Sequence, residues 1–244
     1  MLIEFILLFL FAGVPYYVYF EKTKQLQHEK IFFLSAFLVI VGIVISNMYP
    51  QEMSMPFIII AFIASLYSLY KAEKTRNLYK LSYYILFFNA PMFIMFDTKQ
   101  SSYYAAALLF TLFGIYLMAK YYEKNYGSAN YQSVSGITLV TPYAGLFLTI
   151  YLTALALYPP FPNSLLFLHT ILLADVNMLW YFIVMVIFFG NFLIAMRVMA
   201  KTVFGKPNEY VHYIDLNQKE IWIHLTMLAI LLVLSVLGLK EVLS

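Results

Sequence analysis

The sequence contains no cysteine and has few charged residues. Without cysteine the chain can form no disulfide, and it offers no thiolate nucleophile and no Cys-ligated metal or iron–sulfur site. Charged residues make up 11% of the 244 positions, whereas a soluble domain carries roughly 25%. The net charge of +3 is too small to favour a nucleic acid as a partner. The scarcity of charge also argues against a soluble fold.

Apolar residues are abundant instead. They make up 63% of the chain, and the mean hydropathy is +0.81. A soluble fold of this length cannot bury so much apolar surface, so we expect a lipid bilayer around the protein. The sequence has no P-loop, no HExxH, no Gly-x-Ser-x-Gly and no aspartate-rich prenyltransferase motif. We therefore expect an all-α, polytopic transmembrane bundle that binds no cofactor or metal and has no catalytic residues.

Apolar runs of about 17–25 residues predict spanning helices. One long apolar stretch, 136–174, is interrupted by prolines, and we expect it to cross once as a broken helix. We predict a single transmembrane domain over residues 1–244 with about eight spans. The uninterrupted runs are 2–20, 31–48, 56–70, 81–96, 103–118, 178–196 and 221–239.

The basic residues favour this number of crossings. With eight spans, 13 of the 15 basic residues fall in loops on one side, namely 21–30, 71–80, 119–135 and 197–220. Basic residues collect on the cytoplasmic side of a membrane. A second crossing within 136–174 would move the basic residues of 197–220 to the other side. We therefore expect a multi-pass protein with both termini outside. We place it in a bacterial plasma (inner) membrane, with an organelle-encoded origin as the alternative.

The predicted break lies at Pro159, Pro160, Pro162 and Asn163. Proline removes a backbone donor and clashes with the preceding helical turn, so three prolines in four residues end a helix. Broken helices near the bilayer midplane are common in ion sites, because their ends present dipoles and unpaired backbone groups. The alternative is an ordinary loop outside the bilayer, followed by a short surface segment.

Two histidines are candidates for a proton path. His169 follows the break, and a neutral imidazole can both accept and donate a proton. Its structural alternative is a bond to the carbonyls that the break leaves free. His224 lies one turn into the last span, and its alternative is an interfacial position beside Trp222.

Three other polar side chains complete the candidate ion path. Asn89 and Asn191 lie within spans, where an amide either joins helices by hydrogen bonds or orders water. Lys80 lies at a span end on the basic side, where its long stem can also let the charge reach the membrane surface.

Several short motifs follow one another in the second half of the chain. They are GITLVTPYA (136–144), LTALALYPP (152–160), RVMAKTVFG (197–205), DLNQKE (215–220) and LGL (237–239). In this order the chain resembles the antiporter-like proton-channel subunits. These are the large membrane subunits of respiratory complex I, with relatives in Mrp-type antiporters and membrane-bound hydrogenases. The resemblance covers about 130–244, and RNLYKLSY (76–83) extends it weakly to 76, which leaves 1–75 unmatched.

The resemblance implies a second antiporter-like half that works with other membrane subunits and is at most a non-catalytic part of an oxidoreductase complex. The chain departs from the family in one important respect. Family members carry a Lys or Glu about eight residues after the first proline of the break, and here that position is Phe167. A second family position, a histidine, corresponds to the segment 87–89, which has no ionisable group.

Three functions are consistent with these features. The chain could conduct protons or cations within a respiratory or hydrogenase-type complex, with His169 as the relay. It could be a structural subunit of such a complex that carries no ions, which the missing charge at Phe167 favours. Since relatives of the family also pair with partners in cation-coupled bicarbonate or CO2 uptake, a membrane role there is the third.

Overall fold

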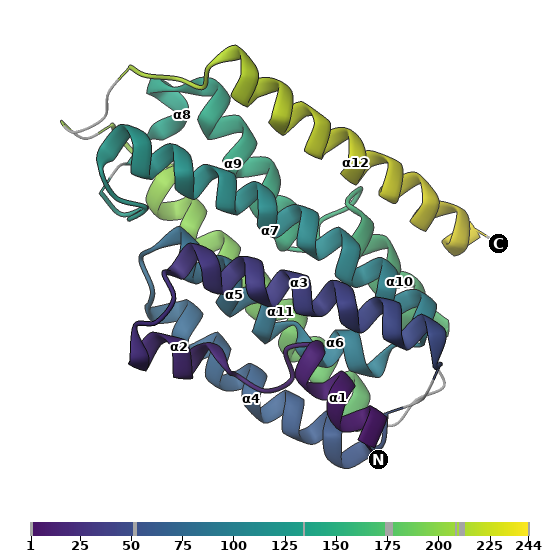
Figure 1. Cartoon of the computed structure of the whole chain (residues 1–244). Helices are drawn as coiled ribbons and strands as arrows, with labels where there is room; N and C mark the ends of the chain where they lie inside the picture. The colour runs from purple at the N-terminus through teal and green to yellow at the C-terminus, as the bar shows by residue number, and fades with distance from the viewer. Residues whose placement is uncertain are drawn as a thin grey trace. The chain divides into compact units, whose positions relative to one another are not determined.

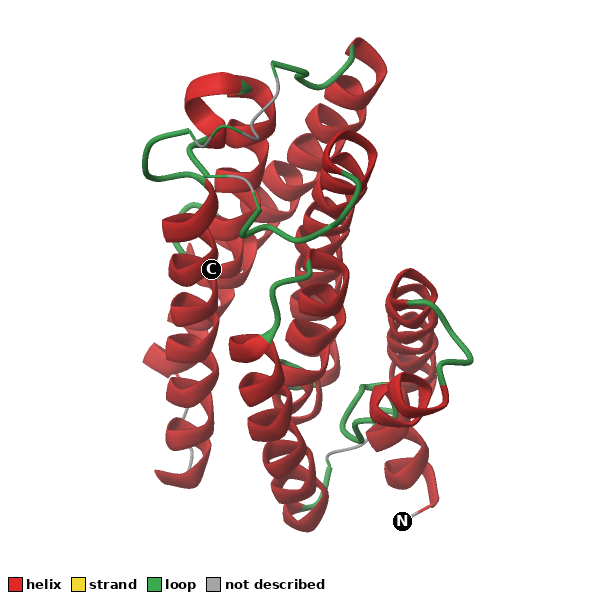
Figure 2. Ribbon diagram, turned by 90° about the vertical axis from the view of Figure 1, so that its left-hand side faces the viewer, coloured by secondary structure: helices red, strands yellow, loops and turns green. Residues whose placement is uncertain are grey.

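The computed structural model describes residues 2–50, 53–133, 135–173, 178–207, 209 and 213–243, and the side chains of all these except 169–173 and 241–243. The described residues are almost entirely helical and include no strand (Figure 2). The prediction of an all-α protein is confirmed. Figure 1 labels the helices, whose bounds are α1 (Leu2–Leu10), α2 (Tyr17–Thr23), α3 (His28–Met48), α4 (Met55–Lys74), α5 (Leu78–Phe88), α6 (Ala90–Met95), α7 (Thr98–Tyr126), α8 (Ile137–Val140), α9 (Pro142–Leu155), α10 (Pro162–Leu173), α11 (Met178–Thr202) and α12 (Gln218–Leu243).

Five of these helices are long and apolar enough to cross a membrane. They are α3, α4, α7, α11 and α12, and each contains one of the predicted apolar runs. Large apolar side chains lie at the surface of these helices, such as Phe37 on α3, Ile63 on α4 and Val236 on α12, as expected for helices in a bilayer. Several such helices fit a multi-pass membrane protein. The total of about eight crossings stays a prediction.

The other three predicted spans are each divided into shorter helices. Segment 2–20 forms α1 and α2, and segment 81–96 forms α5 and α6 around Asn89. The expectation of a single broken helix is therefore wrong. Pro91 accounts for the interruption at Asn89, because it removes a backbone donor and crowds the carbonyl four residues earlier. The interruption after Leu10 contains Ala12 with a positive φ of 58°, followed by Gly13 and Pro15.

The break within 136–174 lies slightly earlier than predicted. Helix α9 ends at Leu155 and α10 begins at Pro162, so the interruption covers 156–161. Pro162 and Asn163 belong to the first turn of α10, where proline is tolerated because the first helical N–H groups have no intrahelical partner. A further division separates α8 from α9 at Thr141, just before Pro142.

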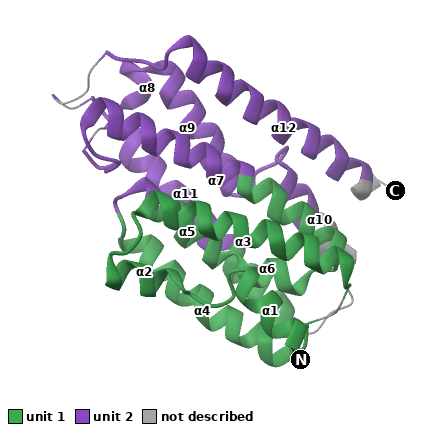
Figure 3. Ribbon diagram, in the orientation of Figure 1, with its two compact units in different colours: residues 1–75, 80–109, 175–187 green, residues 76–79, 110–174, 188–244 purple. Residues whose placement is uncertain are grey.

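The chain divides into two compact units (Figure 3). Unit 1 comprises residues 1–75, 80–109 and 175–187, and unit 2 comprises 76–79, 110–174 and 188–244. Helix α1 packs against α3 and α4 within unit 1, and α10 packs against α12 within unit 2. Both units have aromatic cores. In unit 1, for example, the buried Tyr17 ring contacts the rings of Tyr83, Tyr84 and Phe87.

Candidate functional site

The second half-helix of the main break presents an aromatic side chain where the resembled family has a charge. Phe167 on α10 is buried, and its ring stacks on Phe188 of α11 with centroids 5.0 Å apart and planes at 21°. A phenyl ring can neither accept nor donate a proton. His169 lies two residues further along α10, but its side chain lies outside the described part of the structure, so its proposed relay role stays a prediction.

A buried polar atom lies just after the break, in the first turn of α10. The Asn163 side chain is 3% exposed, and its Oδ1 atom has no hydrogen-bond partner among the described residues. A buried amide oxygen of this kind commonly binds a water molecule. Pro159 and Pro160 are exposed and carry no such group. Beside Pro159, an apolar cavity of about 250 Å³ is lined by Ala156, Leu157, Tyr158, Pro159, Phe188, Phe189 and Phe192.

Asn89 joins helices in unit 1. Its side chain is fully buried, its Nδ2 donates to the carbonyl of Ile85 at 2.8 Å, and Tyr104 on α7 donates its hydroxyl to Asn89 Oδ1 at 2.6 Å. The amide therefore closes the end of α5 and ties it to α7. Since both ends of the amide are engaged by protein groups, this geometry favours helix joining over the ordering of water.

Two further predicted residues occupy different environments. Asn191 is fully buried on α11 in unit 2. Lys80 is partly exposed on α5 in unit 1, where its charge acts on Glu21. Asn191 and His224 both belong to unit 2, and Lys80 and Asn89 both belong to unit 1.

His224 is buried between two helices of unit 2. Its side chain on α12 is 2% exposed, and Nδ1 lies 2.9 Å from the hydroxyl of Tyr151 on α9. Its ring also stacks on Phe147, with centroids 4.7 Å apart. Trp222, by contrast, is exposed on the same helix. His224 thus packs against α9, and its one described hydrogen-bond partner is a tyrosine.

Other charged groups of unit 2 secure helix ends. Asp215 accepts hydrogen bonds from the backbone N–H groups of Tyr143 and Ala144, each at 3.1 Å, and so caps α9 from a distant loop. Glu220 and Asn217 bond reciprocally at the start of α12 as a capping box. Lys124 pairs with Glu220 at 2.8 Å. The two caps stabilise the starts of α9 and α12, and the ion pair joins α7 to α12.

A cluster of titratable groups in unit 1 was missed by the sequence analysis. We call it the Glu21 cluster, and it consists of Glu21 on α2, His28 on α3, Lys71 on α4, and Lys80, Tyr83 and Tyr84 on α5. Tyr83 donates its hydroxyl to Glu21 Oε1 at 2.7 Å, and Tyr84 donates to the same oxygen. Lys71 Nζ lies 3.4 Å from Glu21 Oε2.

The cluster extends from a partly exposed histidine to buried hydroxyls. His28 is partly exposed, and its Nδ1 lies 3.3 Å from the Tyr83 hydroxyl. Tyr83 and Tyr84 are buried, and the Glu21 side chain is 13% exposed. A carboxylate is costly to bury unless it is paired and hydrogen-bonded. Here the two phenols and Lys71 meet that need.

The surroundings of Glu21 keep its carboxyl group ionised. Burial by itself raises the pKa of Glu21, but the hydrogen bonds from Tyr84 and Tyr83 and the positive charges of Lys71 and Lys80 lower it by more. The net effect is a pKa below the ordinary value of 4.5. At neutral pH the cluster therefore contains a carboxylate.

The sequence places members of this cluster on one side of the expected topology but does not link them to one another. Glu21, Lys71 and Lys80 all follow or precede predicted spans on the basic side of the expected topology, and so does His28. Taken alone, a basic residue at a span end such as Lys80 is explained by its long stem, which lets the charge reach the membrane surface. No local pattern links Glu21 to residues 50 and 62 positions further along.

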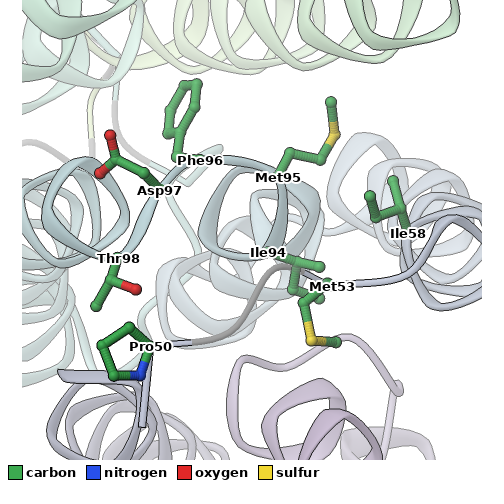
Figure 4. Close-up of a pocket in the computed structure, with 8 residues that line it drawn as sticks. All are labelled: Pro50, Met53, Ile58, Ile94, Met95, Phe96, Asp97 and Thr98. Atoms are coloured by element: carbon green, nitrogen blue, oxygen red, sulfur yellow. The ribbon is translucent and has the colours of Figure 1, made fainter. Parts of the chain in front are cut away.

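Unit 1 also contains an open pocket of about 410 Å³. It is lined by Pro50, Met53, Ile58, Ile94, Met95, Phe96, Asp97 and Thr98 (Figure 4). Its one carboxylate, Asp97, accepts a hydrogen bond from the N–H of Gln100 at 2.8 Å and so caps α7. Within the described residues, no group of three or more His, Asp or Glu side chains could hold a metal ion.

No family model matches the chain, and no curated protein matches it either.

Proposed function

We propose that this chain is a membrane subunit of a proton- or cation-translocating complex of the respiratory or hydrogenase type. The observation that carries the proposal is the helix break at 156–161, which lies within a series of motifs in the order of the antiporter-like subunits. Two more interrupted segments, α1–α2 and α5–α6, support it, because broken helices provide the backbone groups that ion paths use. The buried, unpartnered oxygen of Asn163 supports a water at the break.

A second candidate is a structural subunit of the same kind of complex that carries no ions itself. Two observations favour it. Phe167 stacks on Phe188 where the family has a charge, and the Asn89 amide is held by Ile85 and Tyr104. In this case the chain would support the conducting partners by packing against them.

The first experiment is gentle detergent extraction of the tagged chain from its native membrane, followed by mass spectrometry of its partners. Both candidates predict membrane subunits of a redox or hydrogenase complex among them. A single large soluble partner would indicate cation-coupled bicarbonate or CO2 uptake instead. A chain that purifies alone would contradict both candidates.

Ion flux separates the two candidates. If the chain conducts through the second half-helix, His169→Ala should abolish proton or cation flux by the purified complex in lipid vesicles. Thr170→Ala, one residue along the same helix, is the control. If His169→Ala leaves flux intact while deletion of the chain dismantles the complex, the structural role is the better description.

The proposed topology places the chain in the plasma (inner) membrane with both termini outside. Because the sequence has no cysteine, single substitutions give an unambiguous labelling signal. A membrane-impermeant maleimide should label Lys99→Cys in intact cells and Gln25→Cys only after the membrane is opened. The reverse pattern would invert the topology, and labelling of both in intact cells would change the number of crossings.

A further inference from the structure

The Glu21 cluster contains a continuous row of hydrogen-bonding groups. His28 Nδ1 lies 3.3 Å from the Tyr83 hydroxyl, which in turn lies 2.7 Å from Glu21 Oε1. The row starts at a partly exposed imidazole and ends at a carboxylate that is mostly shielded from solvent. Each member can accept one proton while it releases another.

We propose that this row is a proton-exchange site, in which Glu21 takes up and releases protons through Tyr83 and His28. The inference rests on the proposed function and adds a site to it, within residues 1–84, most of which lie outside the segment that resembles the antiporter-like family. The chemical cargo is the proton, because the row offers donors and acceptors but too few oxygen ligands for a metal cation.

The transfer balances without any other reactant. The imidazolium of His28 gives its Nδ1 proton to the Tyr83 oxygen as the Tyr83 hydroxyl proton moves to Glu21 Oε1. The O–H bond of Tyr83 is broken and re-formed, so Tyr83 ends unchanged. The products are a neutral imidazole and a carboxylic acid, and the imidazole is protonated again by a hydronium ion of the solvent, which becomes water.

The charges around Glu21 return the site to its starting state. Lys71 on α4 and Lys80 on α5 both favour the ionised carboxylate, so a proton delivered to Glu21 is readily released. Tyr84 donates to the same carboxylate oxygen as Tyr83 but is not linked to His28 by a described bond. Because, among the described residues, only Tyr83 is hydrogen-bonded to both His28 and Glu21, Tyr83 carries the proton and Tyr84 holds the carboxylate in place. The ring of Tyr17 packs against the rings of both tyrosines, and the Tyr17 hydroxyl is engaged by Ser68 at 3.1 Å.

The test is proton flux through the co-purified complex in lipid vesicles that contain a pH-sensitive dye. Glu21→Gln keeps one carbonyl oxygen that can accept from both tyrosines, but the amide cannot take up a proton. It should lower proton flux at least about tenfold. Tyr83→Phe should have a similar effect because it interrupts the row. Tyr84→Phe removes a hydrogen bond to the same oxygen and should leave most of the flux.

A matched carboxylate outside the row provides a control. Tyr79 donates its hydroxyl to Glu123 Oε2 at 2.7 Å in unit 2, so Glu123→Gln alters the same kind of bond without touching the site. It should leave flux unchanged. A small acid such as formate should partly restore flux in Glu21→Ala by replacing the missing carboxyl group, which a purely structural defect would not allow.

The outcomes separate this inference from the function on which it rests. If the wild-type complex conducts and Glu21→Gln conducts equally well, the exchange site is wrong and the conducting function stands. Equal losses in Tyr83→Phe and Tyr84→Phe would indicate a structural role and overturn the relay. A wild-type complex with no flux above that of empty vesicles would overturn both. Infrared difference spectra give an independent readout, since acidification should produce a carboxylic-acid C=O band that is absent in Glu21→Gln.

Discussion

The two units of the molecule use their charged side chains differently. In unit 1, charged and titratable groups from four helices meet around the single carboxylate of Glu21. In unit 2 the acidic residues are spread over helix ends, where Asp215 caps α9 and Glu220 begins α12. Titratable side chains that lie close together can exchange protons, whereas acidic side chains at separate helix ends stabilise those helices. The comparison places the candidate proton chemistry in unit 1.

The largest expected effect is the loss of the Glu21 side chain. Glu21→Ala leaves the hydroxyls of Tyr83 and Tyr84 without their acceptor and Lys71 without its partner. We expect it to lower the free energy of unfolding by about 2–3 kcal/mol, measured by chemical denaturation in detergent. The control, Glu123→Ala, affects an exposed carboxylate and should cost less than about 1 kcal/mol. Equal costs would remove the distinction between the two carboxylates.

The contribution of Glu21 to the free energy of unfolding should depend on pH. Because the pKa of Glu21 is lower in the folded protein than in the unfolded chain, its ionised form stabilises the fold at pH values above the unfolded pKa. This stability is lost as pH falls through the folded pKa. The difference in stability between wild type and Glu21→Gln should therefore be constant near neutral pH and disappear in acid. A difference that grows in acid would have the wrong sign.

In unit 2 the largest effect should come from the cap of α9. Asp215→Ala removes the acceptor for the N–H groups of Tyr143 and Ala144. We expect a loss of about 1 kcal/mol in the free energy of unfolding. Asp215→Asn, which keeps one acceptor oxygen, should recover part of it. A neutral effect on stability would show that water replaces the cap.

The smallest effect should come from the buried histidine. Tyr151→Phe removes the hydroxyl that lies 2.9 Å from His224 Nδ1 and leaves the aromatic packing in place. We expect a loss of about 0.5–1.5 kcal/mol in the same denaturation assay, with proton flux unchanged. A large loss of flux would place a proton path in unit 2 and reverse the comparison.

Parts of both the fold and the candidate site were predictable. The apolar runs predicted helices at α3, α4, α7, α11 and α12, because spanning length and composition are local properties. The interruptions near Pro15 and Pro91 were not predicted, because each proline stands within a continuous apolar run whose length alone predicts one spanning helix. The sequence predicted Asn89 as an amide within a span that either joins helices or orders water, and its contacts with Ile85 and Tyr104 favour helix joining.

The sequence by itself determined that the chain is helical and suited to a membrane, since hydropathy and proline positions act through the backbone and the solvent. The tertiary structure decided which polar groups meet. Glu21 lies 50 positions before Lys71 and 62 positions before Tyr83, and the three residues belong to different helices. Their meeting depends on how α2, α4 and α5 pack, and hydrogen bonds over a few ångströms cannot be read from residue order. Tertiary packing likewise stacks the ring of Phe167 on α10 against the ring of Phe188 on α11.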